Sequence, residues 1–359
     1  MPNTHPGKLI KCSGTEREMS MFVNQIRIRR FRGIKETEEP LELKRFNVLI
    51  GRNNSGKTAL LEALSLLPHP ELEVPWAFVS SRTRLIHEAL HGGPLKVLTY
   101  KYTGRAEVSY ELSTKNGVLR AKVEITPSQA SLLMEEAGRY RPMGLEATAK
   151  RFRSSGLVGP GASMGELSNL VLFIPSSDAF LRRLVKGIYD NFDLVEDTGA
   201  HNRVVREVVN RCVDEEFTEV VPVKEELRLR KEYPNGVSFH VRLEDMGDGL
   251  ERAISVLLWL EVLRPRLVLW DDFEANMHPS LIGEVLRWLD GHDWQVILAT
   301  HSLDVLYRLV ETWPRDAQVV LLHRTADDVL RASYKGLEEL DRALEARQDP
   351  RYLQEWLKL

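Results

Sequence analysis

The sequence predicts an α/β fold with a mixed, largely parallel central sheet, and three observations support this prediction. An apolar run at residues 46–50 leads through a glycine-containing turn into a helical segment. After Gly249, short apolar strands alternate strictly with helices, which is typical of a parallel sheet with right-handed crossovers. Between these parts, β-rich runs joined by the turn Lys115-Asn116-Gly117 indicate an antiparallel subdomain.

The turn at residues 51–58 has the sequence GRNNSGKT, which is the spacing of a phosphate loop. Gly51 and Gly56 allow the backbone to curl so that successive N–H groups point into one concavity, and the following helix offers its positive end to phosphate. We expect Lys57 to reach the outer phosphates of a nucleotide and Thr58 to ligate Mg²⁺. A chance match is the alternative, since the pattern fixes few positions, but the flanking strand and helix favour a phosphate loop.

Composition limits the classes of protein that fit the chain. Of its 359 residues, 43% are hydrophobic and 28% are charged, as in ordinary globular proteins. The formal net charge of -3 provides no overall attraction to nucleic acid or anionic lipid. Cys12 and Cys212 are too few for a disulfide framework, and no apolar run is long enough to cross a bilayer. We therefore expect a cytoplasmic protein without a membrane partner.

Changes in pattern along the chain predict its organisation. The expected regions are a flexible N-terminal extension at 1–20, a head at 21–330 with core halves at 21–78 and 236–330 around an insertion at about 79–235, and a helical C-terminal tail at 331–359.

The expected elements of the first half-core and the insertion follow from periodicity and turn signals. The helix after the phosphate loop should end before Pro68, whose ring and missing N–H forbid continuation. No long heptad array is present, so an extended coiled coil is not expected in the insertion. The predictions are strands at 26–31, 41–43, 46–50, 95–102, 106–112 and 118–125, helical residues at 128–154, a loop at 154–168, helices at 180–194 and 202–216, and a hairpin at 225–233 and 237–243.

The second half-core has the clearest alternation. The predictions are a helix at 250–263, a strand at 267–270, a helix at 281–289, a strand at 296–300, a helix at 303–310, a strand at 319–322, an edge strand at 329–334 and a helix at 337–346.

Polar residues follow two of the predicted parallel strands. Asp271 and Asp272 end the apolar run 267–270, and His301 follows the next strand. Because α/β proteins place ligand chemistry at the carboxyl ends of strands, we expect Asp271 to hold Mg²⁺ through water and Asp272 to orient or deprotonate an attacking water. His301 could contact a terminal phosphate. Alone, the acids also fit an ordinary turn and the histidine a structural residue, but their order after a phosphate loop favours function.

A small-residue turn opens the helix that precedes these acids. Its sequence is Met246-Gly247-Asp248-Gly249. The N-terminus of such a helix is a second anion site, although a glycine-rich turn capped by Asp248 explains the same residues.

Taken in order, these motifs resemble those of the ABC-type ATPases of the SMC and RecF class, most closely the small AAA-family heads related to the overcoming-lysogenization-defect (OLD) proteins. The resemblance implies a P-loop NTPase of ABC type with a mixed central sheet, an antiparallel β-subdomain and an inserted helical lobe. It spans residues 22 to about 323, although the insertion matches only loosely. The motifs that carry it are IRRFRGI at 28–34, NVLIGRNNSGKT at 47–58, MGDG at 246–249, DDFEANMHP at 271–279 and THS at 300–302.

The resemblance also implies a site and an assembly, namely an ATPase head that binds Mg-ATP and forms a head-to-tail homodimer on ATP. The residues implied for ATP are Arg32, Gly51, Asn53, Asn54, Ser55, Gly56, Lys57 and Thr58, and those for Mg²⁺ are Thr58 and Asp271. The implied catalytic residues are Lys57, Asp272 and His301, with Glu274 in reserve, and the signature that covers the ATP of the other copy is Met246, Gly247, Asp248 and Gly249.

Three departures from the family pattern bear on the rate of hydrolysis. Gly247 stands where the signature usually has serine, which removes a hydroxyl from the transferred phosphate. Asp272 stands where glutamate is usual, which shortens the reach to water by one methylene. No glutamine loop is evident between Ala59 and Asp245. We therefore expect slow or partner-stimulated hydrolysis.

The expected partners follow from the same resemblance. OLD-type relatives often carry a Toprim nuclease domain after the head, and the 36 residues that follow His323 (359 minus 323) are too few for one. A separate nuclease or other effector, acting in DNA repair or antiphage defence, is therefore expected, with DNA as a further partner. A cluster of cations and aromatics could bind DNA, although a solvated helical face explains it better. This cluster is Arg139, Tyr140, Arg141, Lys150, Arg151, Phe152 and Arg153.

Three other functions stay open. An ATP-gated scaffold would bind ATP and dimerise with negligible hydrolysis, and the departures at Gly247 and Asp272 favour it equally. A transporter's ATPase subunit fits less well with the motifs Phe31-Arg32-Gly33 and Met277-His278-Pro279. A small-molecule kinase shares the phosphate loop but not the two strand-end motifs.

Overall fold

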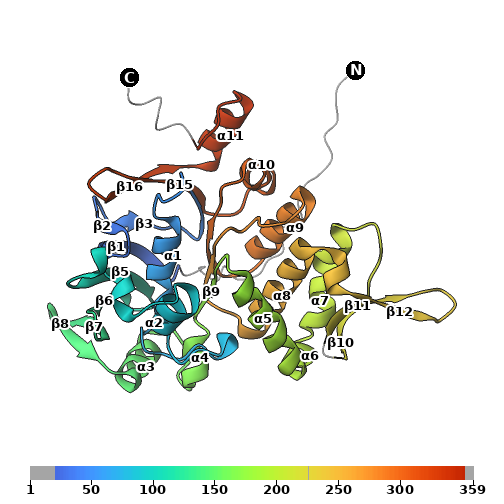
Figure 1. The fold of residues 1–359 in the computed structure, drawn as a ribbon, viewed down its shortest axis with the longest axis horizontal. Coiled ribbons are helices and arrows are strands. Elements are labelled where there is room, and N and C mark those ends of the chain that lie inside the picture. Colours follow the sequence, from blue (N-terminus) through green and yellow to red (C-terminus); the bar gives the residue numbers. More distant parts are fainter. Residues whose placement is uncertain (1–20, 225, 352–359) are drawn as a thin grey trace.

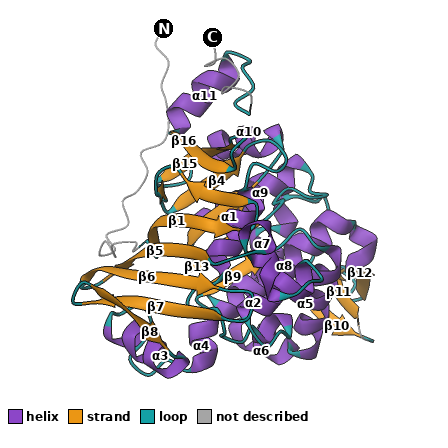
Figure 2. Cartoon of the chain, turned by 60° about the vertical axis from the view of Figure 1, so that its left-hand side comes forward, coloured by secondary structure: helices purple, strands orange, loops and turns teal. Residues whose placement is uncertain are grey.

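A 13-stranded sheet runs through the molecule and forms one continuous stack of strands in Figure 2. The computed structural model describes residues 21–224 and 226–351, so the predicted N-terminal extension, residue 225 of the predicted hairpin and the end of the tail lie outside the described residues. The strands of this sheet are β1 (Val23–Phe31), β2 (Ile34–Thr37), β3 (Leu41–Glu42), β4 (Phe46–Ile50), β5 (Ala106–Thr114), β6 (Gly117–Ile125), β7 (Ala130–Glu136), β8 (Arg139–Met143), β9 (Val171–Ile174), β13 (Leu267–Trp270), β14 (Gln295–Ala299), β15 (Ala317–Arg324) and β16 (Val329–Lys335).

The sheet has a parallel part and an antiparallel part. Its strand order is β8-β7-β6-β5-β1-β2-β16-β15-β4-β14-β13-β9, and β3 pairs with β1. Strands β9, β13, β14, β4 and β15 are parallel neighbours. Strands β1, β5, β6, β7 and β8 pair antiparallel. The predicted α/β class with a mixed central sheet is confirmed.

The burial of the strands explains why apolar residues are continuous in the parallel part of the sheet and alternate in the antiparallel part. Every residue of β4, β9, β13 and β14 is buried. This is expected for parallel strands on which other elements of the fold pack from both faces. In β5, residues Ala106, Val108, Tyr110 and Leu112 are buried and alternate with half-buried residues, as expected for a sheet with one face toward the core.

Helices pack beside the sheet, and in the view of Figure 2 most of them gather on one side of it. The helices are α1 (Lys57–Ser65), α2 (Arg82–Arg84), α3 (Leu145–Ser154), α4 (Met164–Ser168), α5 (Asp178–Asp190), α6 (Phe192–Thr198), α7 (Ala200–Glu207), α8 (Asp248–Leu263), α9 (Pro279–Asp290), α10 (Leu303–Thr312) and α11 (Leu337–Glu345). Short 3-10 turns lie at Pro75–Ala77, Leu95–Leu98, Tyr100–Tyr102, Val209–Arg211 and Leu243–Met246, and a π-helical turn lies at Leu85–Leu90.

A second, three-stranded sheet belongs to the insertion. It contains β10 (Glu219–Val223), β11 (Glu226–Glu232) and β12 (Ser238–Arg242), all antiparallel. The hairpin of β11 and β12 projects from the rest of the molecule in Figure 1. Leu243–Met246 follows β12 directly, so this hairpin is joined without a linker to the turn that opens α8.

The buried amide of Gln295 fastens the beginning of the chain to the parallel strands. Its Oε1 accepts hydrogen bonds from the N–H groups of Phe22 and Val23 at 3.2 and 2.8 Å. Its Nε2 donates to the carbonyl oxygens of Val23 and Lys44 at 2.7 and 2.9 Å. One side chain therefore satisfies backbone groups beside β1 and β4, which leaves no buried polar group of the amide unpaired.

Two predictions in the insertion are wrong. Residues 95–102 form 3-10 turns and not a strand, because Lys101 and Tyr102 have φ angles of 53° and 60°, which a strand cannot contain. Of the residues 128–154 predicted to be helical, 130–136 and 139–143 form strands β7 and β8, and only Leu145–Ser154 forms a helix, α3. The buried residues Ala130, Leu132 and Met134 alternate with more exposed ones, so the period is that of a strand.

Three further predictions need correction. Residues 329–335 form a strand as expected, but β16 is not an edge strand, because it lies between β2 and β15. The predicted helical tail therefore begins with strand residues, and helix α11 follows. The predicted loop at 154–168 ends in helix α4, and strand β9, the apolar run at Val171–Ile174, was not among the predictions. Among the residues that the structure describes, no helix is both long and apolar enough to cross a membrane.

Candidate functional site

The carboxyl ends of the five parallel strands meet at one edge of the sheet, and the predicted site residues lie there. The phosphate loop follows β4, Asp271 follows β13, and His301 comes shortly after β14. The register pairs Trp270 with Leu298 and Ala299 with Leu49, so these ends are level. This arrangement confirms that the separated sequence motifs converge.

The phosphate loop has the backbone that only glycine permits. Gly51 and Gly56 have φ angles of 148° and 105°. A Cβ on Gly51 would collide with the carbonyl oxygen of Leu322 and with the Ser55 hydroxyl. Gly56 is the N-cap of α1 and supplies no side-chain cap. The first N–H groups of α1 are therefore open to an anion, and the buried Ser55 hydroxyl has no hydrogen-bond partner among the described residues.

The ammonium group of Lys57 lies inside the loop. Its Nζ donates to the carbonyl oxygens of Gly51 and Arg52 at 2.9 and 3.2 Å. Burial lowers the pKa of Lys57, and the charges of nearby acids, first Asp271 and then Asp272, oppose that change. Lys57 therefore stands between the loop and the two strand-end carboxylates, with its hydrogen bonds made to groups that phosphate oxygens could replace.

Thr58 and Asp271 are in direct contact. The Thr58 hydroxyl donates to Oδ2 of Asp271 at 2.8 Å. Asp271 is only 3% exposed, and burial raises its pKa to about 6, although the hydrogen bond from Thr58 acts in the opposite direction. A hydroxyl and a carboxylate side by side are hard oxygen ligands, so these two residues fit Mg²⁺.

The turns after β13 and β14 are tied together by Glu274. Its Oε1 accepts a hydrogen bond from the backbone N–H of His301 at 2.9 Å, and its buried Oε2 has no partner among the described residues. Asp272 is half-buried and has a φ of 44°, in the left-handed region that non-glycine residues rarely adopt. His301 is exposed overall, yet partial burial and then the charge of Lys57 lower its pKa. Two carboxylates and one imidazole therefore surround the end of the phosphate loop.

Two cavities lie against the loop. One of about 330 Å³ is lined by loop residues 53–58, by Arg32 and by His301. The other, of about 810 Å³, is lined by residues 51–55, by the end of β15 and by the chain that follows it. All the residues predicted to bind ATP except Gly51 line the first cavity, and Gly51 lines the second.

Sequence reasoning missed Arg324 and Arg351, two of the cations that line these cavities. Arg324 ends β15 and lines both cavities, and the parallel-strand argument that found Asp271 would also have found it. Arg351 lies in the C-terminal tail, lines the larger cavity and donates from Nη1 to the carbonyl oxygen of His301 at 2.7 Å. No local sequence pattern around Arg351 predicts this contact, because the contact depends on where the C-terminal tail packs.

The predicted signature residues do not line either of these cavities. Gly247 has a φ of 91°, which explains glycine at this position, and Asp248 begins α8. Gly249 packs so closely on the backbone of Asn276 that a Cβ would collide with its carbonyl oxygen. Met246 is the last residue of the preceding 3-10 turn. Within one chain, the signature turn and the phosphate loop therefore face separate spaces.

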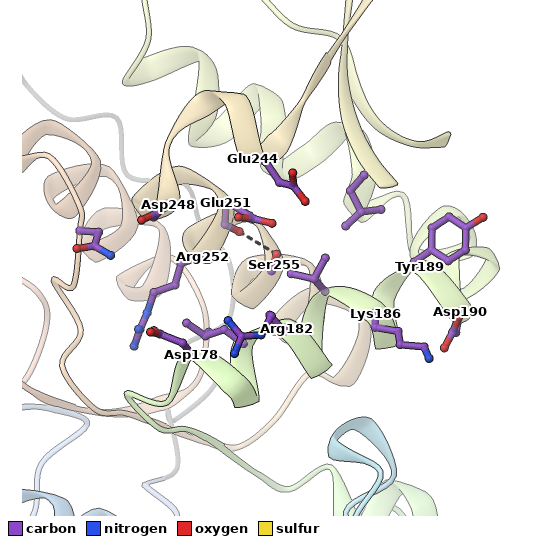
Figure 3. Close-up of a pocket in the computed structure, with 14 residues that line it drawn as sticks. Asp178, Arg182, Lys186, Tyr189, Asp190, Glu244, Asp248, Glu251, Arg252 and Ser255 are labelled. Atoms are coloured by element: carbon purple, nitrogen blue, oxygen red, sulfur yellow. Dashed lines mark hydrogen bonds between the residues drawn. The ribbon is translucent and has the colours of Figure 1, made fainter. Parts of the chain in front are cut away.

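A third cavity, of about 790 Å³, lies between α5 and α8 and is shown in Figure 3. Asp178 from α5 and Arg252 from α8 lie near each other in this view. The buried Arg252 donates from Nη2 to the backbone carbonyl of Asp271 at 3.1 Å. Burial lowers the pKa of Arg252, and Asp272 and Asp178 act against this. The signature helix is thereby joined to the strand end that carries Asp271.

The cluster of cations and aromatics does not form a stacking platform. Phe152 is fully buried, and Arg153 donates from Nε and Nη2 to the carbonyl oxygen of Ala162. Tyr140 is 40% exposed, but the Lys122 ammonium lies 5.0 Å from its ring centre. Of the two aromatic residues in the cluster, only Tyr140 is therefore exposed, and a cation already lies by its ring.

Comparison with protein-family models gives two matches. Residues 21–110 match a model of an AAA ATPase domain. Residues 164–306 match a model of an AAA domain that is associated with AbiEii toxins of type IV toxin–antitoxin systems. A search of curated proteins gave no match.

Comparison with solved structures shows the same fold in SMC heads. The Smc head domain of Pyrococcus furiosus, bound to the C-terminal domain of ScpA, has a TM-score of 0.58 at 12% identity, covering 90% of this chain and 99% of that one. An SMC head bound to the winged-helix domain of ScpA has a TM-score of 0.58 at 13% identity, covering 89% and 99%. The SMC head of Thermotoga maritima has a TM-score of 0.50 at 14% identity, covering 88% and 100%.

Proposed function

We propose that this chain, an SMC- and RecF-like ABC-type ATPase by its fold and motifs, binds Mg-ATP, closes into a head-to-tail homodimer and hydrolyses ATP slowly as a switch. The observation that carries the proposal is the 2.8 Å hydrogen bond between Thr58 and Asp271 beside an uncapped helix N-terminus. It joins a phosphate loop to an acidic strand end, and together these are the parts that a nucleotide hydrolase needs.

Each part of the loop has a distinct role in binding ATP. The N–H groups of residues 53–58 and the positive end of α1 hold the phosphates, and Arg32 and Lys57 neutralise their charge. Mg²⁺, when bound, neutralises developing charge on the phosphates. Thr58 and Asp271 are the residues of this chain that hold the ion.

Hydrolysis needs a group that handles water. Asp272 is the proposed base, because it follows Asp271 at the same strand end and lies near Lys57 and Arg252. His301 lines the phosphate-loop cavity, which supports a contact with the terminal phosphate. Glu274 is the reserve base, since its buried Oε2 is free of partners among the described residues. Slow turnover follows from the short reach of Asp272 and from the missing hydroxyl at Gly247.

A second copy would complete the site. The signature residues Met246, Gly247, Asp248 and Gly249 do not line the phosphate-loop cavities of their own chain, which supports their use in trans. Binding of ATP between two heads would stabilise the closed dimer, and hydrolysis would release it.

The biological setting is proposed from the family comparisons. The match over residues 164–306 to a model associated with AbiEii toxins supports a defence role, with DNA repair as the related alternative. SMC heads that bind ScpA support a separate protein effector docked on this head. The OLD-like placement and the DNA partner stay predictions, and the buried Phe152 argues against stacking of DNA bases at the predicted cluster.

One experiment tests the proposal. Light scattering coupled to size-exclusion chromatography would measure mass with and without Mg-ATP, alongside phosphate release. We expect ATP-dependent dimers and slow release in the native chain, neither of them in Lys57→Ala, and dimers without release in Asp272→Asn. Dimers without any release in the native chain would favour the scaffold. Fast release that Asp272→Asn leaves unchanged, but Glu274→Gln abolishes, would move the base to Glu274.

A further inference from the structure

A buried carboxylate joins the phosphate-loop helix to Arg32. Glu62 lies on α1, four residues after Thr58, and its side chain is 1% exposed. Its Oε2 lies 2.9 Å from Nε of Arg32, whose side chain is 23% exposed and lines the 330 Å³ cavity. A buried ion pair adds little to stability compared with apolar side chains of the same size. The pair therefore calls for a functional explanation.

His91 closes a ring of three side chains. Its Nε2 lies 2.5 Å from Oε1 of Glu62, and its Nδ1 lies 3.2 Å from Nη2 of Arg32. A neutral imidazole with its proton on Nε2 satisfies both contacts, because it donates to the carboxylate and accepts from the guanidinium. Glu62 thus has a partner on each oxygen, and Arg32 is held at two of its nitrogens.

The backbone around Arg32 is fixed as well. Arg32 has a φ of 53°, and its N–H donates to the carbonyl oxygen of Leu98 at 2.9 Å. Arg324 donates from Nη1 to the carbonyl oxygen of Gly33 at 2.9 Å. The guanidinium Nη1 of Arg32 donates to the carbonyl oxygen of Val97 at 3.4 Å. Of the five N–H donors of the Arg32 guanidinium, the contacts with Glu62, His91 and Val97 use three, so two remain, and Arg32 lines the cavity.

We propose that Glu62 is a positioning residue that, supported by His91, holds the Arg32 guanidinium at the phosphate-loop cavity so that its remaining N–H donors bind the phosphates of ATP. This inference rests on the proposed function. A flexible arginine would lose conformational freedom when it binds phosphate, whereas one fixed in advance loses little. Glu62 moves with α1 and hence with Thr58, so the arginine and the phosphate loop stay in register.

The variant Glu62→Gln tests the proposal, because it keeps the shape of the side chain and removes its charge. Titration with a fluorescent ATP analogue is expected to show affinity about tenfold weaker, the loss of one hydrogen bond to a charged group. In steady-state hydrolysis, KM should rise more than kcat falls. Glu261→Gln is the matched control, since Glu261 is also buried and lies 3.0 Å from Arg203 and 3.5 Å from His292. It should bind ATP like the native chain.

A double-mutant cycle separates positioning from a general loss of structure. If Glu62 acts through Arg32, the double variant Glu62→Gln with Arg32→Gln should bind ATP as weakly as Arg32→Gln alone. Additive losses, or native affinity in Glu62→Gln, would overturn the inference. A native chain that fails to bind ATP would instead overturn the proposed function.

A second variant covers the case in which Glu62→Gln does not fold. His91→Ala removes both the donor to Glu62 and the acceptor for Arg32, and the His91 side chain is 27% exposed. Its affinity should fall severalfold in a protein whose circular dichroism and melting temperature are native. Native affinity in a folded His91→Ala would then count against the positioning role.

Discussion

Thr58 and Asp271 are separated by 213 positions in the sequence, and the hydroxyl of one donates to the carboxylate of the other at 2.8 Å. The contact forms because β4 and β13 both pair with β14, so the ends of three parallel strands lie side by side. Burial of Asp271 leaves its carboxylate accessible only where the loop arrives. A hydrogen bond between these two side chains therefore joins the two half-cores at the candidate site.

Replacing Asp271 by asparagine should uncouple Mg²⁺ from nucleotide binding. The amide still accepts from Thr58 but no longer carries charge, so Mg²⁺ should strengthen ATP binding about 10- to 100-fold less than in the native chain. Titrations of ATP with Mg²⁺ and with EDTA measure this difference. Asp304→Asn, on the exposed start of α10, serves as a control. Full Mg²⁺ dependence in Asp271→Asn would remove Asp271 from the ion site.

Arg351 should affect turnover although it lies in the tail. It is held by both oxygens of Asp349, at 2.6 to 3.1 Å, and donates to the carbonyl oxygen of His301. Arg351→Gln would release that carbonyl, and kcat should fall by about threefold to tenfold. Steady-state phosphate release measures the change, with the exposed Arg347→Gln as the control on the same tail. Equal rates in both variants would show that the tail contact has no bearing on catalysis.

His69 should make stability depend on pH. Its Nδ1 accepts from the N–H of Glu71 at 3.1 Å, and its Nε2 lies 3.0 Å from the carbonyl oxygen of Met143, so the fold requires the neutral ring. Burial lowers the pKa of His69 from its ordinary value of 6.5. The stabilisation is therefore present above that value and is lost as pH falls below it. Urea unfolding between pH 8 and pH 5 should show a smaller decline in His69→Gln than in the native chain.

Replacing Gly247 or Gly249 of the signature by alanine should lower the free energy of unfolding by different amounts. At Gly249 a methyl group would push against the Asn276 carbonyl, and we expect a loss of about 1 to 3 kcal/mol in the free energy of unfolding. At Gly247 the space is open, and the cost is the positive φ of 91°, about 1 kcal/mol. Urea denaturation compares them. A smaller loss at Gly249 than at Gly247 would contradict the close packing of α8 on the turn after β13.

The sequence predicted four of the five parallel strands, β4, β13, β14 and β15, because their signals are local, whereas β9 was not predicted. Strand β13 has the predicted bounds, since an apolar run between Pro265 and two acids leaves little choice. The predicted meeting of Gly51, Asp271 and His301 needed only the rule that parallel strands end at one edge. The antiparallel part was harder, because Leu132, Leu133 and Met134 fit a helix and a strand alike until their neighbours are known.

The supporting contacts of the site could not be predicted from patterns. Glu62 looked like one more polar residue on a helix, and its burial follows from Arg32 and His91, which come from other turns. The segment from residue 95 to 102 alternates like a strand, yet it turns so that Leu98 can accept the N–H of Arg32. Such long-range pairings leave no periodic trace in either partner.

The position of β4 between β14 and β15 has a consequence for synthesis on the ribosome. The strand that precedes the phosphate loop emerges early, but both of its neighbours, Gln295–Ala299 and Ala317–Arg324, emerge roughly 250 residues later. Until then, an apolar strand with two unpaired edges is exposed in the nascent chain, a state that favours aggregation or chaperone binding. Nucleotide binding should therefore appear late, when translation has passed β15. It would report that both strands that pair with β4 have been made.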